Sequence, residues 1–270
     1  MQKTILVTGA TDGIGLETAG KLVSLGHTVL VHGRNPEKLE KVKRMLASLP
    51  DGGAVESYVS DLSRLADVAV FAKAVAEKHA RLDVLINNAG VYKAADPAAE
   101  ERLDVRFTVN TIAPYFLTQK LLPLLGVSGR VVNISSAAQA PVDPEALAGR
   151  IKLSDDFASY AQSKLALTMW SRYMAVSLKH KGPAVIAVNP GSMLGSKMVQ
   201  EAFGVGGKDL GIGADILCRA ALSDEFAAAS GLYFDNDAGQ FTSPHPDALN
   251  PQKTEEIVHL IETVLGDTTQ

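Results

Sequence analysis

The sequence predicts an α/β protein built on a doubly wound, mostly parallel sheet with helices on both faces. The first observation is an alternation of short apolar runs, rich in Val, Ile and Leu, with longer segments of helical periodicity. Such alternation is typical of parallel strands buried between helices. The second observation is that no linker or low-complexity tract interrupts the pattern. We therefore expect one domain, residues 1–270.

The bulk composition excludes several classes of protein. The net charge of −4 argues against a general binder of nucleic acid or of anionic membranes. With one cysteine, Cys218, the chain can form no internal disulfide, and the six histidines show no metal-ligand spacing, so we expect no metal site. The N-terminus does not resemble a signal peptide and no apolar run spans a bilayer, so a cytoplasmic protein is expected.

The chain begins with the pattern of a phosphate-binding turn. Residues 3–8 predict a buried strand, residues 9–15 hold three glycines, and the apolar-periodic helix that follows ends at Gly26. Glycine lets the backbone approach a pyrophosphate, and a helix N-terminus offers N–H groups and partial positive charge. The spacing differs from the common G-x-G-x-x-G pattern. We predict a dinucleotide site here rather than a tight turn without a ligand.

The end of the second strand, residues 28–32, bears on the choice of cofactor. An acidic residue there would bind the 2′-hydroxyl of NAD. Here Gly33 leaves room and Arg34 can pair with a 2′-phosphate, which favours NADP over NAD. Asp12, in the glycine loop, does not add positive charge. The alternative is that Arg34 only faces water. Asn35 is expected to cap the next helix.

The remaining elements follow from periodicity and from breaks at Gly, Pro, Asn and Ser. Strands are expected at residues 54–59, 83–86, 130–134, 184–188 and 232–234, and helices at residues 36–49, 63–80, 98–125, 160–180, 214–222 and 251–265. Ser63 is expected to cap its helix, and residues 235–250 are expected to be loop. Asn110 lies within a helix, where Asn is a mediocre helix former, and Pro114 predicts a kink beside it.

Tyr160 and Lys164 are a candidate acid/base pair. Four residues apart on a helix, they share one face. A tyrosine has an unperturbed pKa of about 10, and a nearby cation lowers it by favouring the phenolate. The alternative is an ordinary exposed helix face. Two asparagines, Asn87 and Asn88, come directly after a strand, where ligands bind in open α/β sheets, although asparagine at this place can also simply shape a turn.

Two segments are expected to line a substrate pocket. Residues 137–159 form an excursion between the fifth strand and the helix of Tyr160, and residues 192–213 contain six glycines and predict a mobile flap. Their apolar side chains suggest an apolar or aromatic carbonyl compound, and packing within the protein is an equal alternative. These side chains are Phe157, Met193, Leu194, Met198 and Phe203.

Together these residues resemble the short-chain dehydrogenase/reductase superfamily. The matching motifs come in the family's order over about residues 4 to 195. They are Thr8-Gly9-x-x-x-Gly13-Ile14-Gly15, Asp61-Leu62, Asn87-Asn88-Ala89-Gly90, Asn110, Ser136, Tyr160-x-x-x-Lys164 and Pro190-Gly191. The resemblance implies a Rossmann-like sheet of seven strands, a nicotinamide cofactor, a homo-oligomer, and hydride transfer between the cofactor and a carbonyl or alcohol.

The resemblance also implies roles for single residues. Tyr160 would be the acid/base, Lys164 would bind the nicotinamide ribose and lower the pKa of Tyr160, Ser136 would hold the substrate oxygen, and Asn110 would anchor a water relay to Lys164. Of these, Tyr160 and Lys164 would also contact the cofactor. The other expected cofactor-binding residues are Gly9, Thr11, Asp12, Gly13, Ile14, Gly15, Arg34, Asn35, Asp61, Leu62, Asn88, Gly90, Pro190 and Met193. Ser196 stands near the place where the family often has a carboxamide-binding threonine.

The 23 residues between Ser136 and Tyr160 are similar to the retinol-dehydrogenase-like and carbonyl-reductase-like branch, which tends to use NADP. Two alternatives stay open at this point. The same tyrosine and lysine could serve reduction of a C=C bond in an enone. The chain could also be a non-catalytic NADP(H)-binding regulatory protein, although such a protein would be expected to lose Tyr160 or Lys164.

Overall fold

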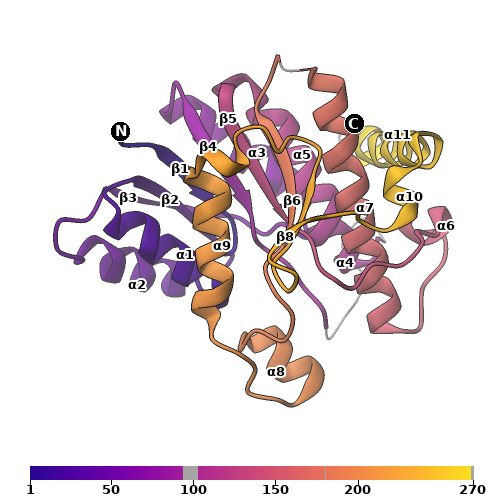
Figure 1. The fold of residues 1–270 in the computed structure, drawn as a ribbon, viewed down its shortest axis with the longest axis horizontal. Coiled ribbons are helices and arrows are strands. Elements are labelled where there is room, and N and C mark those ends of the chain that lie inside the picture. Colours follow the sequence, from indigo (N-terminus) through magenta and orange to yellow (C-terminus); the bar gives the residue numbers. More distant parts are fainter. Residues whose placement is uncertain (94–102, 180, 269–270) are drawn as a thin grey trace.

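The computed structural model describes residues 1–93, 103–179 and 181–268 and contains one eight-stranded sheet of order β3-β2-β1-β4-β5-β6-β7-β8 (Figure 1). The strands are β1 (Thr4–Val7), β2 (Thr28–Gly33), β3 (Val55–Val59), β4 (Leu82–Asn87), β5 (Leu125–Ile134), β6 (Ala184–Asn189), β7 (Tyr233–Asp235) and β8 (Gln240–Thr242). The first seven run parallel and β8 pairs antiparallel with β7. The predicted α/β class and parallel sheet are confirmed, and the strand count is eight rather than seven.

Helices cover both faces of the sheet (Figure 1). One face carries α1 (Gly13–Ser24), α2 (Pro36–Ala47) and α9 (Leu210–Leu222); the other carries α3 (Leu65–Lys78), α5 (Ala113–Leu121) and α7 (Asp156–Leu178), with α11 (Pro251–Thr268) packed against α7. Short helices are α4 (Val105–Phe107), α6 (Pro144–Leu147), α8 (Lys197–Phe203) and α10 (Pro246–Leu249).

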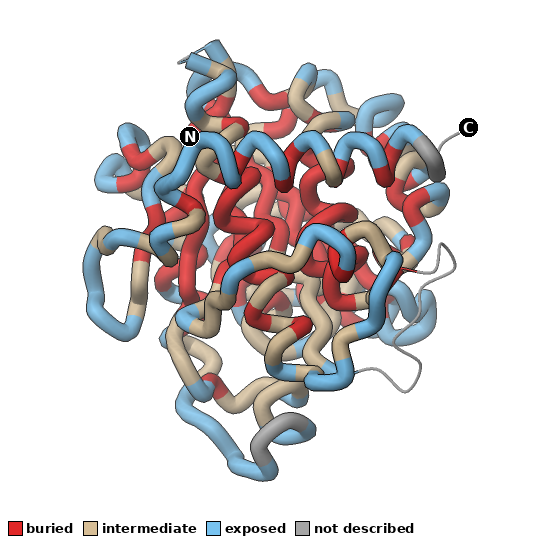
Figure 2. Tube along the Cα trace, turned by 90° about the vertical axis from the view of Figure 1, so that its right-hand side faces the viewer, coloured by how far each residue is buried: buried red, intermediate tan, exposed pale blue. Residues whose placement is uncertain are grey.

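The alternation of side chains along each strand divides the core into two layers. In β1, Leu6 joins the cluster under α3, α5 and α7, whereas Ile5 and Val7 join the cluster under α1 and α9. All three side chains are fully buried. Figure 2 shows the result: buried positions run along the central strands, and the exposed positions lie on the outer sides of the helices.

Five expected elements differ from the structure. Ser63 does not cap its helix: its hydroxyl donates to Asp61, and α3 begins after Arg64. Residues 235–250 are not all loop, because β8 and α10 lie within them. The flap, residues 192–213, contains α8 and the start of α9, and the excursion, residues 137–159, contains α6 and the start of α7.

The helix expected at residues 98–125 is the fifth difference. Residues 94–102 lie outside the described residues. From Val105 on, α4 passes into a π-helical turn, Thr108–Ile112, then into α5 and a 3₁₀ turn, Leu122–Leu124. Pro114 has no N–H, so the carbonyl of Asn110, four residues earlier, lacks its usual α-helical donor. The predicted kink is thus present as a wider turn at Asn110.

Over the described ranges, 1–93, 103–179 and 181–268, none of the helices combines the length and the apolar character needed to cross a bilayer.

Candidate active site

The predicted site residues gather at the carboxyl edge of the sheet. They follow β1, β2, β3, β4, β5 and β6 in turn, and Tyr160 and Lys164 lie in the first half of α7. The connections reverse direction at β1, since β2 lies on one side of it and β4 on the other. Open α/β sheets bind ligands at such a switch point. The fold therefore brings side chains from six loops into one place.

The glycine turn after β1 has no room for other residues. Gly9 has a φ of +65°, and a β-carbon there would lie 2.8 Å from Ala89 Cα. A β-carbon on Gly15 would lie 2.3 Å from Asn88 Nδ2 and 2.4 Å from the Gly9 carbonyl oxygen. Asp12 then caps α1 by accepting a hydrogen bond of 2.8 Å from the N–H of Gly13. The turn, called the glycine cradle below, exposes backbone without side chains at the N-terminus of α1. Such a turn can bind a pyrophosphate.

Asn88 closes this turn from β4. Its Nδ2 donates to the carbonyls of Thr8 (2.9 Å) and Gly9 (3.2 Å), and its N–H donates to the Thr8 hydroxyl. Asn87 instead points into the core, where it donates to Thr118 and Asn133. In this structure Asn88 therefore shapes the turn, and its role toward a ribose stays a prediction.

His32 holds the glycine turn through a hydrogen bond to Gly9. The sequence did not single this residue out. Its Nδ1 accepts the N–H of Gly9 at 3.2 Å and its Nε2 lies 3.0 Å from the Ser60 carbonyl, so the proton sits on Nε2. Its ring stacks on Phe71 with centroids 4.8 Å apart. Burial lowers the pKa of His32 to about 4, and the bond to Ser60 and the charge of Asp61 offset only part of this effect.

We expect His32 to make the protein acid-labile. Because its pKa is depressed in the folded state, protons bind the unfolded chain more strongly, and stability falls as pH drops from about 6.5 toward 4. Between pH 7 and pH 5 the loss is about 2 kcal/mol. Urea unfolding of His32→Leu should show lower stability at pH 7 and a flatter pH dependence. The matched variant of an exposed histidine, His259→Gln, should keep the wild-type slope. An unchanged slope in His32→Leu would contradict the assignment.

The adenosine end of the predicted site carries a basic residue that sequence reasoning missed. Lys38 Nζ lies 2.7 Å from Asp12 Oδ2, and Arg34 is exposed at the end of β2. Asn35 caps α2 as expected, accepting the N–H of Lys38 at 2.8 Å. Lys38 lies in the first turn of α2, four residues after Arg34, and this closeness in sequence is the signal that could have drawn attention to it.

At this end of the site, the expectation for Gly33 is wrong, and Asp61 and Leu62 make contacts within the protein. The space at Gly33 is not left open for a phosphate, because a β-carbon there would lie 2.5 Å from Thr11 Cγ2. Asp61 accepts hydrogen bonds from the N–H and hydroxyl of Ser63, and Leu62 is buried in the core. Both residues stand at the end of β3, the position expected for adenine contacts.

Ser136 and Tyr160 meet at the end of β5. The Ser136 hydroxyl lies near enough to the Tyr160 phenol to lower its pKa, and it accepts the N–H of Ala138 at 3.1 Å. Its neighbour Ser135 points away: its hydroxyl lies 2.7 Å from that of Thr168 in the core. Of the two serines, Ser136 is the one placed beside the tyrosine.

Lys164 lies beneath this pair. Only 3% of its side chain is exposed, and its Nζ donates to the Ile134 carbonyl at 2.7 Å. The ammonium is 5.7 Å from the centre of the Tyr160 ring. A β-carbon placed on Gly90 would come within 3.6 Å of the same ammonium, so Gly90 leaves the approach to Lys164 open. Burial lowers the pKa of Lys164 to about 8.

The acidity of Tyr160 differs from the prediction. Burial raises the pKa of the Tyr160 phenol above its ordinary value, and Ser136 offsets only part of that rise. The expected lowering by Lys164, whose ammonium is 5.7 Å from the ring centre, is not found, and burial is the largest effect. The phenol is therefore protonated at neutral pH.

Asn110 holds a loop with its side chain. Its Oδ1 accepts the N–H of Val91 at 2.8 Å, and its Nδ2 donates to the Val91 carbonyl at 2.9 Å and to the Ser163 hydroxyl at 3.0 Å. Ser163 in turn donates to the Tyr160 carbonyl at 2.7 Å. The role of Asn110 in a water relay stays a prediction.

The base of the flap is held by the turn between β7 and β8, which sequence reasoning also missed. Asp237 accepts the N–H of Ser192 (2.9 Å) and the side-chain amide of Asn189 (3.0 Å), and Asn236 donates to the Pro190 carbonyl at 2.9 Å. Burial alone would raise the pKa of Asp237, but these hydrogen bonds from Ser192 and Asn189 lower it. The Pro190-Gly191 turn after β6 is therefore held in place by residues of the turn between β7 and β8.

The flap itself lies over the cofactor cradle. The Ser196 β-carbon is 3.6 Å, and the Met198 methyl 3.8 Å, from the places that β-carbons on Gly13 and Gly90 would take. Ser196 also caps α8 by accepting the N–H of Val199. Met193, with a φ of 57°, is 38% exposed.

Some apolar residues of the flap and the excursion pack within the protein, and others are exposed, as a pocket lining would be. Leu194 is buried, whereas Met193 and Phe157 are largely exposed. The side chain of Phe203 lies outside the described residues.

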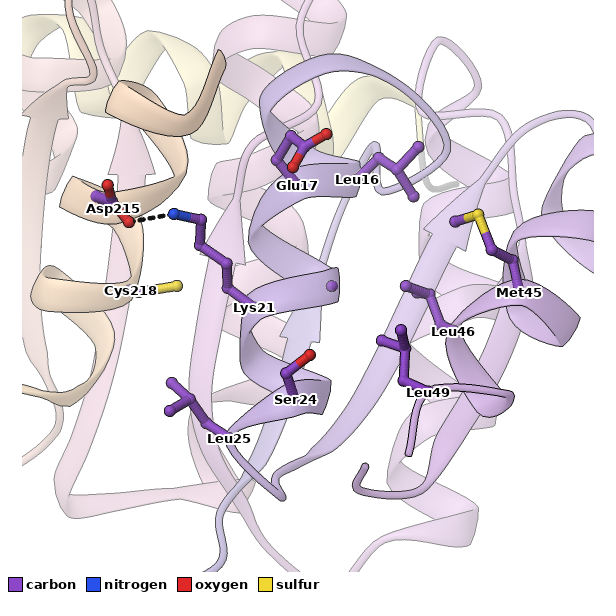
Figure 3. Close-up of a pocket in the computed structure, with 11 residues that line it drawn as sticks. Leu16, Glu17, Lys21, Ser24, Leu25, Met45, Leu46, Leu49, Asp215 and Cys218 are labelled. Carbon is purple, nitrogen blue, oxygen red and sulfur yellow. Dashed lines mark hydrogen bonds and ion pairs between the residues drawn. The ribbon is translucent and has the colours of Figure 1, made fainter. Parts of the chain in front are cut away.

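A separate groove of about 660 Å³ lies between α1, α2 and α9 (Figure 3). Its walls are apolar, with Leu25 and Met45 exposed, and Lys21 pairs with Asp215 across one side. Burial raises the pKa of Cys218 in this groove to about 11, so its thiol is unreactive at neutral pH. None of the predicted site residues lines the groove.

Comparison with known proteins agrees with this geometry. Residues 3–204 match the family described as short chain dehydrogenase. The chain belongs to the short-chain dehydrogenase family. It is 30% identical over 263 residues to retinol dehydrogenase 13 of Mus musculus, covering 91% of this chain and 79% of the relative. It is 30% identical over 277 residues to retinol dehydrogenase 12 of Homo sapiens, covering 98% and 86%.

Several solved structures that are similar to this chain contain a bound cofactor. The RhlG/NADP complex of Pseudomonas aeruginosa has a TM-score of 0.71 at 26% identity and covers 88% of this chain and 95% of that chain. The landomycin C-6 ketoreductase LanV, with bound NADP and rabelomycin, has a TM-score of 0.67 at 28% identity, covering 87% and 94%. The protein is thus an oxidoreductase that uses a nicotinamide cofactor and acts on CH–OH or C=O groups.

Proposed function

We propose that residues 1–270 form one catalytic domain that transfers hydride between NADP(H) and a carbonyl or alcohol substrate, with Tyr160 as the acid/base. The observation that carries this proposal is the grouping of Ser136, Tyr160 and Lys164 beside the glycine cradle. A hydroxyl beside a protonated phenol, with a buried cation beneath, is the set of groups that carbonyl reduction requires.

The residues of the chain divide the work. Gly9, Gly13 and Gly15 would hold the pyrophosphate and Lys164 the nicotinamide ribose, and the bound cofactor supplies hydride to the carbonyl carbon. Ser136 and Tyr160 donate hydrogen bonds to the substrate oxygen, where negative charge develops. Tyr160 then gives up its proton. Its raised pKa keeps this proton in place at neutral pH until the oxygen becomes basic.

NADP rather than NAD is supported by charge. Arg34 follows β2 and Lys38 lies in the first turn of α2, where Asp12 holds it toward the glycine turn. Similar structures are solved with NADP. A 2′-phosphate placed here would meet two cations, whereas the hydroxyl of NAD would leave them unused. The exposed Met193 and Phe157 favour an apolar or aromatic substrate.

We expect Arg34→Ala to erase the cofactor preference. A charge-assisted hydrogen bond contributes about 1.5–3 kcal/mol, so NADPH should bind roughly tenfold to a hundredfold more weakly, and NADH should bind as before. Fluorescence titration of both cofactors measures this. The control, Lys41→Ala, removes the same charge from an exposed position of α2. If wild type bound NADH as tightly as NADPH, or Lys41→Ala matched Arg34→Ala, the NADP assignment would be wrong.

A further inference from the structure

Tyr92, which neither the sequence nor the family comparison singled out, lies against the catalytic tyrosine. It follows β4 and the Asn-Asn-Ala-Gly turn. The ring centroids of Tyr92 and Tyr160 are 5.2 Å apart and their planes are tilted by 55°. Tilted aromatic pairs at this distance attract each other, because the edge of one ring meets the face of the other. The ring of Tyr92 therefore flanks the ring that carries the acid/base hydroxyl.

One hydrogen-bonded frame fixes both tyrosines. The residue before Tyr92, Val91, is held at both its N–H and its carbonyl by Asn110. Asn110 also donates to Ser163, whose hydroxyl donates to the Tyr160 carbonyl at 2.7 Å. The backbones that carry the two rings are thus tied together by two buried side chains, Asn110 and Ser163.

Burial and nearby carboxylates keep the hydroxyl of Tyr92 a neutral phenol. Burial raises its pKa, the carboxylates of Asp155 and Asp156 raise it further, and Arg106 acts in the opposite sense. Asp155 caps α7, and Arg106 is bonded to Asp104 and Asp156. These groups are engaged with the start of α7. The part of Tyr92 that remains for a substrate is its uncharged aromatic ring.

We propose that Tyr92 is a specificity-determining residue that stacks on planar, apolar carbonyl substrates as they reach Tyr160. This inference rests on the proposed function, because it takes the substrate oxygen to lie at Ser136 and Tyr160. Tyr92 is only partly buried and stands beside that point, so a flat ring bound to the carbonyl carbon would pack against it. A saturated ring of the same size would lack the aromatic contact. The selected substrates are aromatic aldehydes and ketones.

The test compares benzaldehyde with cyclohexanecarbaldehyde, which has the same ring size without aromaticity. Wild type, Tyr92→Phe and Tyr92→Leu are measured for kcat and KM with NADPH, and for the affinity of each aldehyde for the enzyme–NADP⁺ complex by calorimetry. We expect Tyr92→Leu to lower the preference for benzaldehyde by about fivefold, through KM and affinity rather than kcat. Tyr92→Phe should keep the preference, and NADPH affinity should stay within about twofold in both variants.

The outcomes separate this inference from the proposed function. The role of Tyr92 would be overturned if the wild type bound both aldehydes equally or bound neither. It would also be overturned if Tyr92→Leu kept the preference for benzaldehyde or if Tyr92→Phe lost it. Binding with the expected preference but no turnover of either aldehyde would support Tyr92 and count against the proposed reaction. A reduced affinity for NADPH in Tyr92→Leu would indicate a structural role and also overturn the inference.

Discussion

Replacing Tyr160 by Phe is expected to reduce turnover by about a thousandfold, which is within the usual contribution of general acid–base catalysis. The change removes the hydroxyl that donates the proton and leaves the ring, so packing against Tyr92 is kept. Ser136 then stands alone at the substrate oxygen. NADPH affinity is expected to stay within about twofold, because the cradle and Lys164 are untouched. Single-turnover oxidation of bound NADPH in the presence of an aldehyde measures the loss.

The matched control is Tyr173→Phe, the same change on the same helix, α7, at a position away from Ser136. It is expected to react at the wild-type rate. Tyr160→Phe at a near-normal rate would refute the assignment of the acid/base, and loss of NADPH binding would show that Tyr160 holds the cofactor instead.

Gly15→Ala is expected to disable the cofactor cradle. The new β-carbon would overlap Asn88 Nδ2 at 2.3 Å and the Gly9 carbonyl at 2.4 Å, and one of these atoms is backbone. The turn must therefore move, and Asn88 loses its bonds to Thr8 and Gly9. Overpacking of this kind costs about 1–3 kcal/mol of stability. Because the moved atoms shape the pyrophosphate site, NADPH affinity should fall at least about tenfold.

Gly20→Ala on the same helix is the control for this prediction. A β-carbon there meets Leu46 at 3.7 Å, an ordinary contact, so the variant should bind NADPH normally and gain up to about 1 kcal/mol of stability from the better helix former. Urea unfolding measures the stability of both variants, and titration with NADPH measures their cofactor affinity. Equal behaviour of the two alanine variants would show that the turn is not the cradle.

The sheet was predictable because each of its long strands is an apolar run followed by a turn. The order of those runs also places their polar ends together, so the grouping of Ser136, Tyr160 and Lys164 could be expected. The missed elements are short and depend on distant contacts. For example, β8 has three residues, and Phe241 within it packs between Phe226 and Phe234.

Side-chain directions and burial were beyond local patterns. Lys38 reaches Asp12 because the starts of α1 and α2 lie close together, and Asp237 holds Ser192 across 45 residues of sequence. The pKa of Tyr160 is raised by burial. Sequence spacing shows which charges are near a group and says nothing of how much water the fold removes. That is why the predicted direction of this shift was wrong.

The most direct test of the central claim follows a labelled hydride. The enzyme is incubated with NADPH deuterated at C4 of the nicotinamide, in both stereoisomers, and with a panel of aromatic and aliphatic aldehydes, ketones and enones. The account predicts an alcohol that carries deuterium on its carbinol carbon, from one stereoisomer of the cofactor, and none of it with Tyr160→Phe. Deuterium on the carbon β to an unreduced carbonyl would assign the enzyme to C=C reduction. Tight NADPH binding without any labelled product would contradict catalysis and favour a regulatory protein.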